Sequence, residues 1–358
     1  MFFSLSVRRT TAKEYNVMFA KIKKIMPPEE IKRLTPLNSD LAEYKRKRDK
    51  EAADIITGKD KRKMVVIGPC SADNEDAVCD YVARLAKLAD EVRDKIFVIP
   101  RIYTNKPRTK GEGYKGMLHS PDPSKGTDIQ EGILGLRRMH IRAMRESGLS
   151  PADEMLYPSN YAYVDDLLTY VAIGARSAEN QEHRLVGSGM EIPLGVKNPM
   201  NGSLGVLINS IYASQINNEF KYNDYQVKTD GNPCAHAVLR GSVDIHGNNI
   251  SNYHYEDVMR LLELYTKNKL KNPAVIIDVN HSNSGKNADE QIRIVREILS
   301  NVKYDTSFSG MLKGVMIESY IEDGSQPVYG KVYGKSITDP CIGWVKTENL
   351  IRYMAEKL

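Results

Sequence analysis

The chain lacks the features that mark small secreted domains and membrane proteins. Its four cysteines in 358 residues are too few and too scattered for a disulfide framework. No apolar stretch approaches the ~20 residues that cross a bilayer. The segment MFFSLSVRRTTAKEY places its apolar residues before its arginines and has no sustained apolar core. We therefore expect no secretory signal and a cytoplasmic protein.

Internal repeats, low-complexity tracts and compact metal motifs such as CxxC or HExxH are also missing. Any metal site must therefore be assembled by the fold from residues that are distant in the sequence. Hydrophobic content of 41% and charged content of 27% are ordinary for a soluble globular enzyme. The length fits one large domain with an extension better than two equal domains.

Positive charge is concentrated in residues 1–63, where the runs KIKK, KRKRDKE and KDKRK raise nucleic-acid binding as an alternative. Aromatic residues that would stack on bases are scarce there. A helix with its N-cap at Ser39 and its end at Gly58 would place apolar residues on one stripe: Leu41, Tyr44, Ala52, Ile55 and Ile56. We therefore favour a solvated helix face over a nucleic-acid surface.

Short apolar runs at fairly regular spacing predict eight buried strands, over residues 64–68, 96–103, 151–156, 170–176, 193–198, 235–240, 274–279 and 314–319. Helical patterns fill most gaps and are clearest at 75–93 and 288–300. This alternation predicts an α/β protein with a (β/α)8 barrel, whose active site lies at the C-terminal ends of the strands.

Two segments do not fit simple strand–helix units. Residues 104–128 are rich in Gly, Pro, Lys and Ser and predict a long functional loop, and residues 217–230 alternate as an added β-hairpin does. We divide the chain into an N-terminal extension, 1–63, and a catalytic barrel, 64–358. Within the extension we expect an extended arm at 1–15, a short helix at 17–26 and a helical connection at 29–58.

Four metal-binding residue types follow strands that are neighbours once the sheet closes. Cys70 follows the first strand, His281 ends the seventh, Glu318 lies on the eighth, and Asp339 lies in the following loop. Singly, each is better explained as a buried thiol, a loop histidine or a salt-bridge partner. Together, a thiolate, an imidazole and two carboxylates predict a site for one divalent transition metal such as Mn, Fe, Co or Zn.

Basic residues end four other strands: Arg101, Arg176, Lys197 and Arg240. Each follows an apolar run, so a surface role fits poorly, and buried positive charge is unfavourable unless paired. Lys106 and Arg108 extend this basic group into the long loop, and Glu154 lies on the third strand. Arginine and lysine bind phosphate and carboxylate oxygens, so the mouth is predicted to hold two anionic substrates, at least one of them phosphorylated.

At this point eight segments, in order, resemble the 3-deoxy-D-arabino-heptulosonate-7-phosphate (DAHP) synthases of the microbial aromatic pathway: GPCSADNEDAV, PRIYTNKPRTKGEGYKG, AIGARSAENQEHR, LGVKNPMNGS, HAVLRG, VNHSNSGK, GVMIESYIEDG and YGKSITDPCIGW. The resemblance runs from about residue 17 to the C-terminus. It implies a (β/α)8 barrel that condenses phosphoenolpyruvate with erythrose 4-phosphate and releases phosphate, the first step of the shikimate pathway.

The resemblance also implies roles for individual residues. The family's metal ligands fall on Cys70, His281, Glu318 and Asp339. Its phosphoenolpyruvate contacts fall on Arg101, Lys106, Arg176, Lys197 and Arg240, with Glu154 and the backbone of Ala175 nearby. Its erythrose 4-phosphate contacts fall on Pro107, Arg108 and Thr109. We expect Lys197 to be the general acid at the aldehyde oxygen, with metal-bound water as the competing proton source.

Three other functions compete with this assignment. A 3-deoxy-octulosonate 8-phosphate synthase carries a different motif where this chain has KPRT, and a metal-dependent aldolase would not need so many basic residues at strand ends. A nucleic-acid-binding module would show salt-sensitive binding that survives Arg240→Ala.

The resemblance suggests that residues 1–63 serve subunit contact and help form an amino-acid effector pocket beside residues 157–163 and 188–192. These two segments depart most from the enterobacterial pattern, with YPSNYAY in one and Met190-Glu191 in the other. We therefore expect a homodimer or homotetramer with weak or altered feedback by aromatic amino acids, and neither nucleic acid nor membrane as a partner.

Overall fold

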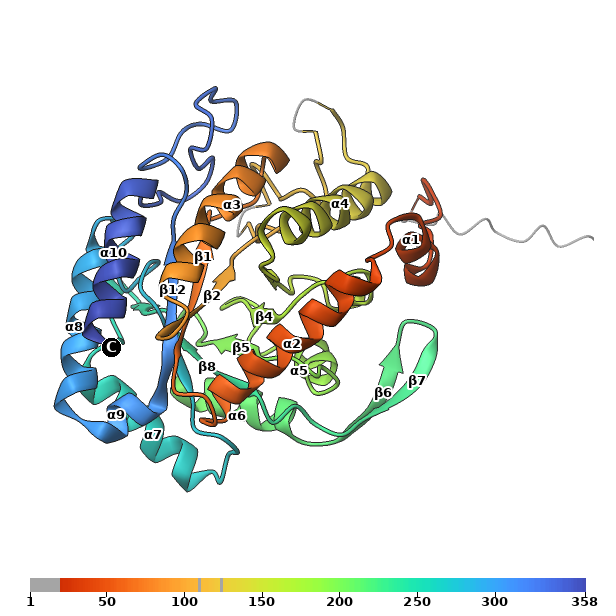
Figure 1. The fold of residues 1–358 in the computed structure, drawn as a ribbon. Helices are drawn as coiled ribbons and strands as arrows, with labels where there is room; N and C mark the ends of the chain where they lie inside the picture. The colour runs from red at the N-terminus through yellow and green to blue at the C-terminus, as the bar shows by residue number, and fades with distance from the viewer. Residues whose placement is uncertain (1–19, 109–110, 123–124) are drawn as a thin grey trace, which may run out of the picture.

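The computed structural model describes residues 20–108, 111–122 and 125–358. The extended arm expected at residues 1–15 lies outside them. Within the described residues, eight parallel strands form the centre of the molecule and helices surround them (Figure 1). The prediction of a (β/α)8 barrel is confirmed.

The barrel strands are connected in the order β2-β1-β12-β11-β8-β5-β4-β3. An isolated parallel bridge between Arg101 and Ala152 joins the two ends of this series and closes the barrel. The strands are β1 (Lys63–Gly68), β2 (Ile96–Pro100), β3 (Ala152–Glu154), β4 (Tyr170–Ile173), β5 (Leu194–Lys197), β8 (Ala235–Leu239), β11 (Val275–Asp278) and β12 (Leu312–Glu318).

The strands are short and almost wholly buried, as the unbroken apolar runs predicted. All five residues of β2 and of β8 are buried, which fits a parallel sheet covered by helices. At the mouth, β1 ends at Gly68, where a Cβ atom would lie 2.2 Å from the carbonyl oxygen of Arg101. Only glycine therefore lets the ends of β1 and β2 approach this closely.

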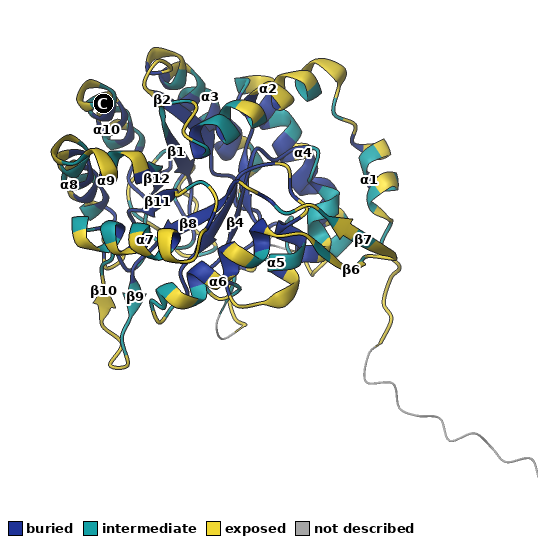
Figure 2. Cartoon of the chain, turned by 90° about the horizontal axis from the view of Figure 1, so that it is seen from below, coloured by how far each residue is buried: buried dark blue, intermediate teal, exposed yellow. Residues whose placement is uncertain are grey.

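The covering helices bury one face and expose the other, as Figure 2 shows by colour. Side chains of Asn74, Asp128, Asn180 and Ser203 cap four of them. The helices are α3 (Glu75–Glu91), α4 (Ile129–Ser147), α5 (Gln181–Gly187), α6 (Leu204–Gln215), α7 (Tyr255–Lys267), α8 (Glu290–Tyr304), α9 (Thr306–Met311) and α10 (Trp344–Lys357). After β3, the 3-10 turn Pro158–Tyr163 takes the place of an α-helix.

The N-terminal extension differs from the prediction in two ways. Residues 20–26 form no helix, so the helix expected at 17–26 is wrong over its described part. Ile25 and Met26 pack against the core but Ile22 is 96% exposed, and a short helix is marginal unless its whole apolar face is packed. The helical connection consists of two helices, α1 (Pro28–Leu34) and α2 (Ser39–Ile56). The N-cap of α2 is Asn38, whose side chain accepts a hydrogen bond from Leu41 N at 2.8 Å, and not Ser39.

Helix α2 packs against the N-terminal end of the barrel. Ala52, Ile55 and Ile56 are buried in one cluster with interior side chains of β1, β2 and β12. Arg48 donates to the carbonyl oxygen of Val98 at 2.5 Å, and its guanidinium lies 4.2 Å from the centre of the Phe97 ring. The predicted stripe is therefore partly right, because Leu41 and Tyr44 stay outside the buried cluster. The division of the chain at residue 63 remains a proposal.

The predicted hairpin at 217–230 is present as β6 (Asn218–Tyr222) and β7 (Tyr225–Thr229), which project from the barrel wall (Figure 1). A smaller hairpin, β9 (Ser242–Val243) and β10 (Asn249–Ile250), was not predicted. The described parts of 104–128 contain no helix or strand, which confirms the long loop.

Candidate active site at the barrel mouth

A cavity of about 230 Å³ opens at the C-terminal ends of the strands. Its walls come from strand ends and from the loops that follow them, as expected for a barrel enzyme. The residues predicted from the sequence that line it are Cys70, Arg101, Lys106, Pro107, Arg108, Glu154, Ala175, Arg176, Lys197, Arg240, His281 and Asp339. Glu318 contacts this group from the buried end of β12, and Thr109 lies outside the described residues.

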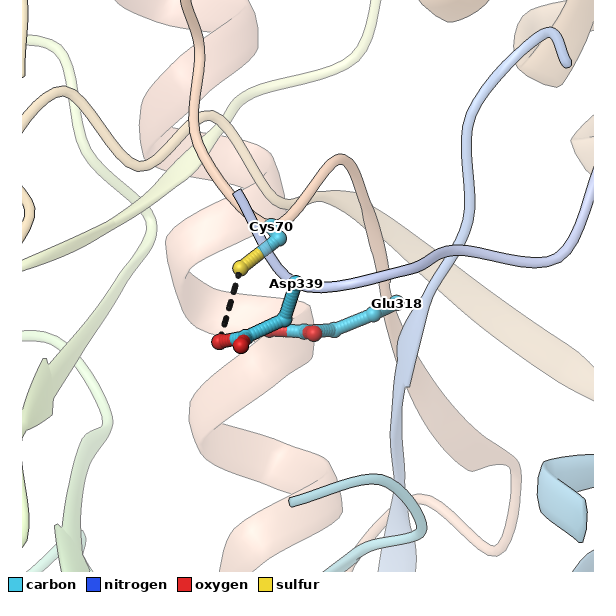
Figure 3. Close-up of side chains that lie close together, drawn as sticks. All are labelled: Cys70, Glu318 and Asp339. Atoms are coloured by element: carbon cyan, nitrogen blue, oxygen red, sulfur yellow. Dashed lines mark hydrogen bonds between the residues drawn. The ribbon is translucent and has the colours of Figure 1, made fainter. Parts of the chain in front are cut away.

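Three of the four predicted metal ligands converge. Donor atoms of Cys70, Glu318 and Asp339 all lie within 4.8 Å of one another (Figure 3). The thiol sulfur of Cys70 lies 3.5 Å from Oδ2 of Asp339. The parallel pairing of β1 with β12 explains the proximity, since it aligns Gly68 with Glu318.

The fourth predicted ligand, His281, lies beside this group. Its Nε2 atom is 3.7 Å from Oε1 of Glu318, while Nδ1 is 2.9 Å from Oδ2 of Asp278. His281 has a φ of 50°, a left-handed conformation that is unusual for a residue with a side chain. This turn after β11 places His281 in the lining of the cavity.

The donor set suits a borderline divalent metal. Burial and the Glu318 carboxylate raise the pKa of the Cys70 thiol to about 11, so the thiolate needs added positive charge. Although burial disfavours the charged carboxyl, His281 and Arg101 keep the pKa of Glu318 below its usual range. A thiolate, an imidazole and two carboxylates together fit Mn, Fe, Co or Zn better than the oxygen-only sites of Mg or Ca.

Lys106 brings positive charge directly to the metal-binding group. Its Nζ atom lies 2.6 Å from the sulfur of Cys70 and 3.1 Å from Oδ2 of Asp339. Despite burial, the charges of Cys70 and Asp339 raise the pKa of this ammonium. Lys106 therefore stays protonated between the metal-binding group and the rest of the cavity.

Arg101 is held by a backbone oxygen and by a carboxylate. It is 2% exposed, donates to the carbonyl oxygen of Pro69, and pairs with Oε1 of Glu318 at 2.9 Å. Its guanidinium also lies 3.8 Å from the centre of the Tyr103 ring. Burial alone would lower the pKa of Arg101, but Glu318 together with Tyr103, Cys70 and Asp278 raises it.

Lys197 and Arg240 form the opposite wall. Nζ of Lys197 donates to Oδ2 of Asp278 at 2.9 Å, and Nη1 of Arg240 donates to Oγ of Ser282 at 3.1 Å. Burial and the charge of Arg176 lower the pKa of Arg240, although Asp278 opposes them. Two arginines that repel each other beside one cavity are suited to share an anion.

Glu154 adds a carboxylate to the lining of the cavity. It is 9% exposed at the end of β3. A Cβ atom at Gly174 would lie 2.5 Å from its Oε1, so glycine at 174 makes room for the carboxylate. Ala175 and Arg176 follow Gly174 and also line the cavity.

Arg108 stands at the rim of the cavity. Its Nε donates to the carbonyl oxygen of Tyr114 at 2.8 Å, which ties the loop to itself and leaves the terminal nitrogens free of this bond. Pro107 precedes it and fixes the backbone there.

Sequence reasoning missed several members of the site. Asp278 contacts both Lys197 and His281, Asn280 donates to Oε2 of Glu318 at 2.6 Å, and Lys286 lies 3.4 Å from Oδ1 of Asp339. Asp278 left a signal, because it is a lone acid within the apolar run AVIIDVN. Asn280 and Lys286 left none that separates them from ordinary loop residues.

Comparison with known proteins gives one consistent result. Residues 39–352 match the model of the DAHP synthetase I family. The chain is 34% identical over 347 residues to a "Phospho-2-dehydro-3-deoxyheptonate aldolase, Trp-sensitive" of Enterobacter agglomerans, covering 94% of this chain and 96% of that protein. It is 33% identical over 352 residues to the Tyr-sensitive enzyme of Escherichia coli K12, covering 96% of each.

A solved structure supports the same relationship. The phospho-2-dehydro-3-deoxyheptonate aldolase of Francisella tularensis superimposes with a TM-score of 0.88 at 32% sequence identity, covering 95% of this chain and 98% of that one.

Among the described residues, no helix is both long and apolar enough to cross a membrane.

Proposed function

The chain belongs to the DAHP synthetase I family, and we propose how the side chains at its barrel mouth carry out the family's reaction. The enzyme condenses phosphoenolpyruvate with erythrose 4-phosphate and water to give DAHP and phosphate, the first step of the shikimate pathway. The observation that carries the residue assignment is the convergence of basic side chains and metal-binding donors on one cavity.

The proposed metal ligands are Cys70, His281, Glu318 and Asp339. This assignment is supported by the 4.8 Å grouping of three of them and by the 3.7 Å approach of His281 to Glu318. A divalent transition metal bound there supplies Lewis-acid polarisation of the aldehyde oxygen of erythrose 4-phosphate.

Phosphoenolpyruvate is proposed to bind against Arg101, Lys106, Arg176, Lys197 and Arg240. These cations pair with its carboxylate and phosphate oxygens and stabilise phosphate as it leaves. Glu154 and the backbone of Ala175 complete this wall and limit the orientations that the substrate can take. Burial of Arg101, Lys197 and Arg240 strengthens their interactions, because water screens these charges less.

Erythrose 4-phosphate is proposed to bind at the rim, with its phosphate on Arg108 and its chain beside Pro107 and Thr109. C3 of phosphoenolpyruvate then attacks the aldehyde carbon, and Lys197 gives its Nζ proton to the aldehyde oxygen. Water captures C2 and releases one proton, which restores the Lys197 ammonium. The tetrahedral intermediate then loses phosphate by cleavage of its C–O bond, and the proton of its C2 hydroxyl leaves with the phosphate as the ketone forms. Lys197 suits the proton transfer because its ammonium is held inside the cavity by Asp278.

The test is an assay on the purified full chain that asks whether consumption of one substrate depends on the other. With Mn²⁺ present, we expect phosphoenolpyruvate to be consumed and phosphate released only when erythrose 4-phosphate is added. Arabinose 5-phosphate should not replace it. Phosphoenolpyruvate loss that needs arabinose 5-phosphate, or no loss with either sugar, would contradict the assignment.

Assembly, regulation and location are proposed on the basis of the relatives. The curated relatives include Trp-sensitive and Tyr-sensitive enzymes, which supports an amino-acid effector site in this chain. We propose a homodimer or homotetramer in the cytoplasm, with residues 1–63 as the contact and regulatory extension. Light scattering of the full chain tests the assembly, and a monomer would rule it out.

A further inference from the structure

One carboxylate, that of Asp278, contacts two side chains to which the proposed function gives different tasks. Its Oδ2 atom lies 2.9 Å from Nζ of Lys197 and 2.9 Å from Nδ1 of His281. Asp278 ends β11 and has no exposed surface. A single oxygen therefore connects a proposed metal ligand with the proposed general acid.

The carboxylate is itself held in place. Its second oxygen, Oδ1, accepts a hydrogen bond from the backbone N of Asn280 at 3.1 Å. Its backbone oxygen accepts another from Nδ2 of Asn283 at 2.8 Å. The parallel pairing of Asp278 with Met316 fixes the strand on which it stands. Asp278 thus has one available orientation.

The contact with His281 decides which imidazole nitrogen faces the metal-binding group. With Nδ1 against Asp278, Nε2 is turned toward Glu318, 3.7 Å from its Oε1. A metal-ligating histidine commonly has a carboxylate on its other nitrogen, which fixes the ring and makes the ligating nitrogen more basic. Without Asp278, the ring of His281 loses the contact that sets this orientation.

The contact with Lys197 decides where the proton donor sits. Lys197 is 3% exposed, and a buried ammonium is unfavourable unless an anion compensates it. Asp278 is the only ion-pair partner of Lys197 among the described residues. Its removal leaves the ammonium without the charge that keeps it at the strand end.

We propose that Asp278 is a positioning residue that holds His281 and Lys197 in one fixed arrangement, so that the metal and the proton donor act on the same aldehyde oxygen. The inference rests on the proposed function for the division of tasks. Its first consequence, on metal affinity, does not depend on catalysis.

The test compares Asp278→Asn with the wild type and with Asp153→Asn as a matched control. Asp153 is also a buried acid on a barrel strand, 4% exposed, but its side chain contacts Thr104 and His140. Mn²⁺ affinity is measured without substrates, from the electron paramagnetic resonance signal of free Mn²⁺. We expect Asp278→Asn to weaken Mn²⁺ binding by about 10- to 100-fold, and Asp153→Asn to leave it within about 3-fold.

A second readout separates the two contacts of Asp278. At Mn²⁺ concentrations that saturate the variant, the activity lost through weaker metal binding at His281 returns. The activity lost through displacement of Lys197 does not return. We therefore expect kcat of Asp278→Asn to stay at least about 10-fold below that of the wild type at saturating metal. A purely structural role would lower the melting temperature and leave both readouts unchanged.

The outcomes are distinct. Unchanged Mn²⁺ affinity in a folded Asp278→Asn variant overturns the inference, and so does full recovery of kcat at saturating Mn²⁺. If Asp278→Asn does not fold, Asp278→Glu keeps the charge but moves the carboxylate, and it should show the same loss of Mn²⁺ affinity. A wild type that binds Mn²⁺ but does not consume phosphoenolpyruvate with erythrose 4-phosphate contradicts the proposed function instead.

Discussion

The Nζ atom of Lys106 lies 2.6 Å from the thiol sulfur of Cys70, although the two residues come from the loops after different strands. This contact brings the proposed phosphoenolpyruvate wall and the proposed metal ligands together. Lys106 also reaches Asp339, so its charge offsets two of the anionic donors. Removal of Cys70 is thus expected to disturb metal binding before it disturbs the fold.

The first prediction concerns Cys70→Ala. Loss of the thiolate should weaken Mn²⁺ binding strongly and lower activity by about 100-fold or more, because Lewis-acid activation is lost. Cys79→Ala is the matched control, since Cys79 is buried on α3 outside the cavity. Metal content and initial rate are measured on both variants. Full activity of Cys70→Ala in excess chelator would show that the site is not required.

The second prediction concerns Arg108→Ala. A charge-assisted contact with a phosphate contributes about 1.5–3 kcal/mol, so the KM for erythrose 4-phosphate should rise by about 10- to 100-fold. The KM for phosphoenolpyruvate should change much less. Arg93→Ala, which removes an arginine paired with Asp90 on the surface, serves as the control. An equal rise in both KM values would contradict the assignment of Arg108 to the sugar phosphate.

These predictions start from residues that the sequence itself identified, for a physical reason. Short unbroken apolar runs such as IFVIP usually form buried strands. In a barrel, the residue that follows such a strand lies at the mouth. Arg101 and Arg240 could therefore be placed from the sequence. Asp278 could not be given a role, because its contact with Lys197 runs from β11 to β5 across β8 and depends on the register of the closed barrel.

The N-terminal extension shows where sequence reasoning failed. The spacing in VMFAKIKKIM suits a helix, but residues 20–26 are not helical. A short helix is stable only when its apolar face is packed, and Ile22 is 96% exposed. Helix α2 has a similar charge density but packs Ala52 and Ile55 against the barrel, so it forms.

The third prediction concerns acid stability through His236. Its Nδ1 lies 2.8 Å from the carbonyl oxygen of Cys234, and its Nε2 lies 3.0 Å from the hydroxyl oxygen of Tyr170. Burial lowers the pKa of His236 to about 4. The unfolded chain, with a histidine pKa near 6.5, binds more protons between these values, so the free energy of unfolding falls as pH drops from about 6.5 to 4.

This histidine alone should contribute a loss of about 3 kcal/mol across that range. His236→Gln keeps a donor and an acceptor but cannot take up the proton. Denaturant melts of both proteins at pH 7 and at pH 4.5 measure the difference. We expect the variant to lose less stability between the two conditions than the wild type; equal losses would exclude His236 as a source of acid sensitivity.

The fourth prediction concerns Arg137, which has no exposed surface on α4. Its guanidinium donates to the backbone and side-chain oxygens of Thr35, to the backbone oxygen of Tyr163 and to both carboxylate oxygens of Asp166. It therefore connects the end of α1 to the segment after β3. Arg137→Met should lower the free energy of unfolding by about 3 kcal/mol, because buried oxygens lose their partner.

The neighbouring Arg138 provides the control for Arg137. Arg138 pairs with Glu131 on the exposed face of α4, and such pairs contribute at most about 1 kcal/mol. Urea melts should therefore separate the two methionine variants clearly. Equal stability of Arg137→Met and Arg138→Met would mean that the buried contacts do not support the fold.

The fifth prediction concerns feedback by aromatic amino acids. Tyr161 and Glu191, from the two segments that we expected to differ most from the enterobacterial pattern, line one hollow of about 490 Å³. The basic residues Lys45, Arg46 and Lys50 of α2 and the acids Asp49, Asp165 and Asp166 also line it. Met190 is 3% exposed, so Glu191 is the member of that pair that a ligand would meet.

An amino-acid effector brings both a carboxylate and an ammonium group into such a hollow. Asp49, Asp165 and Asp166 are paired with Lys45, Lys32 and Arg137. Glu191 is therefore the acid that we expect to repel the effector carboxylate, so binding should be weak. We expect little inhibition by phenylalanine, tyrosine or tryptophan below about millimolar concentration. Glu191→Gln should strengthen any inhibition that occurs, while Glu179→Gln, an exposed acid outside this hollow, should not. Strong inhibition of the wild type by micromolar phenylalanine would defeat this prediction, because the effector carboxylate would then bind tightly beside Glu191.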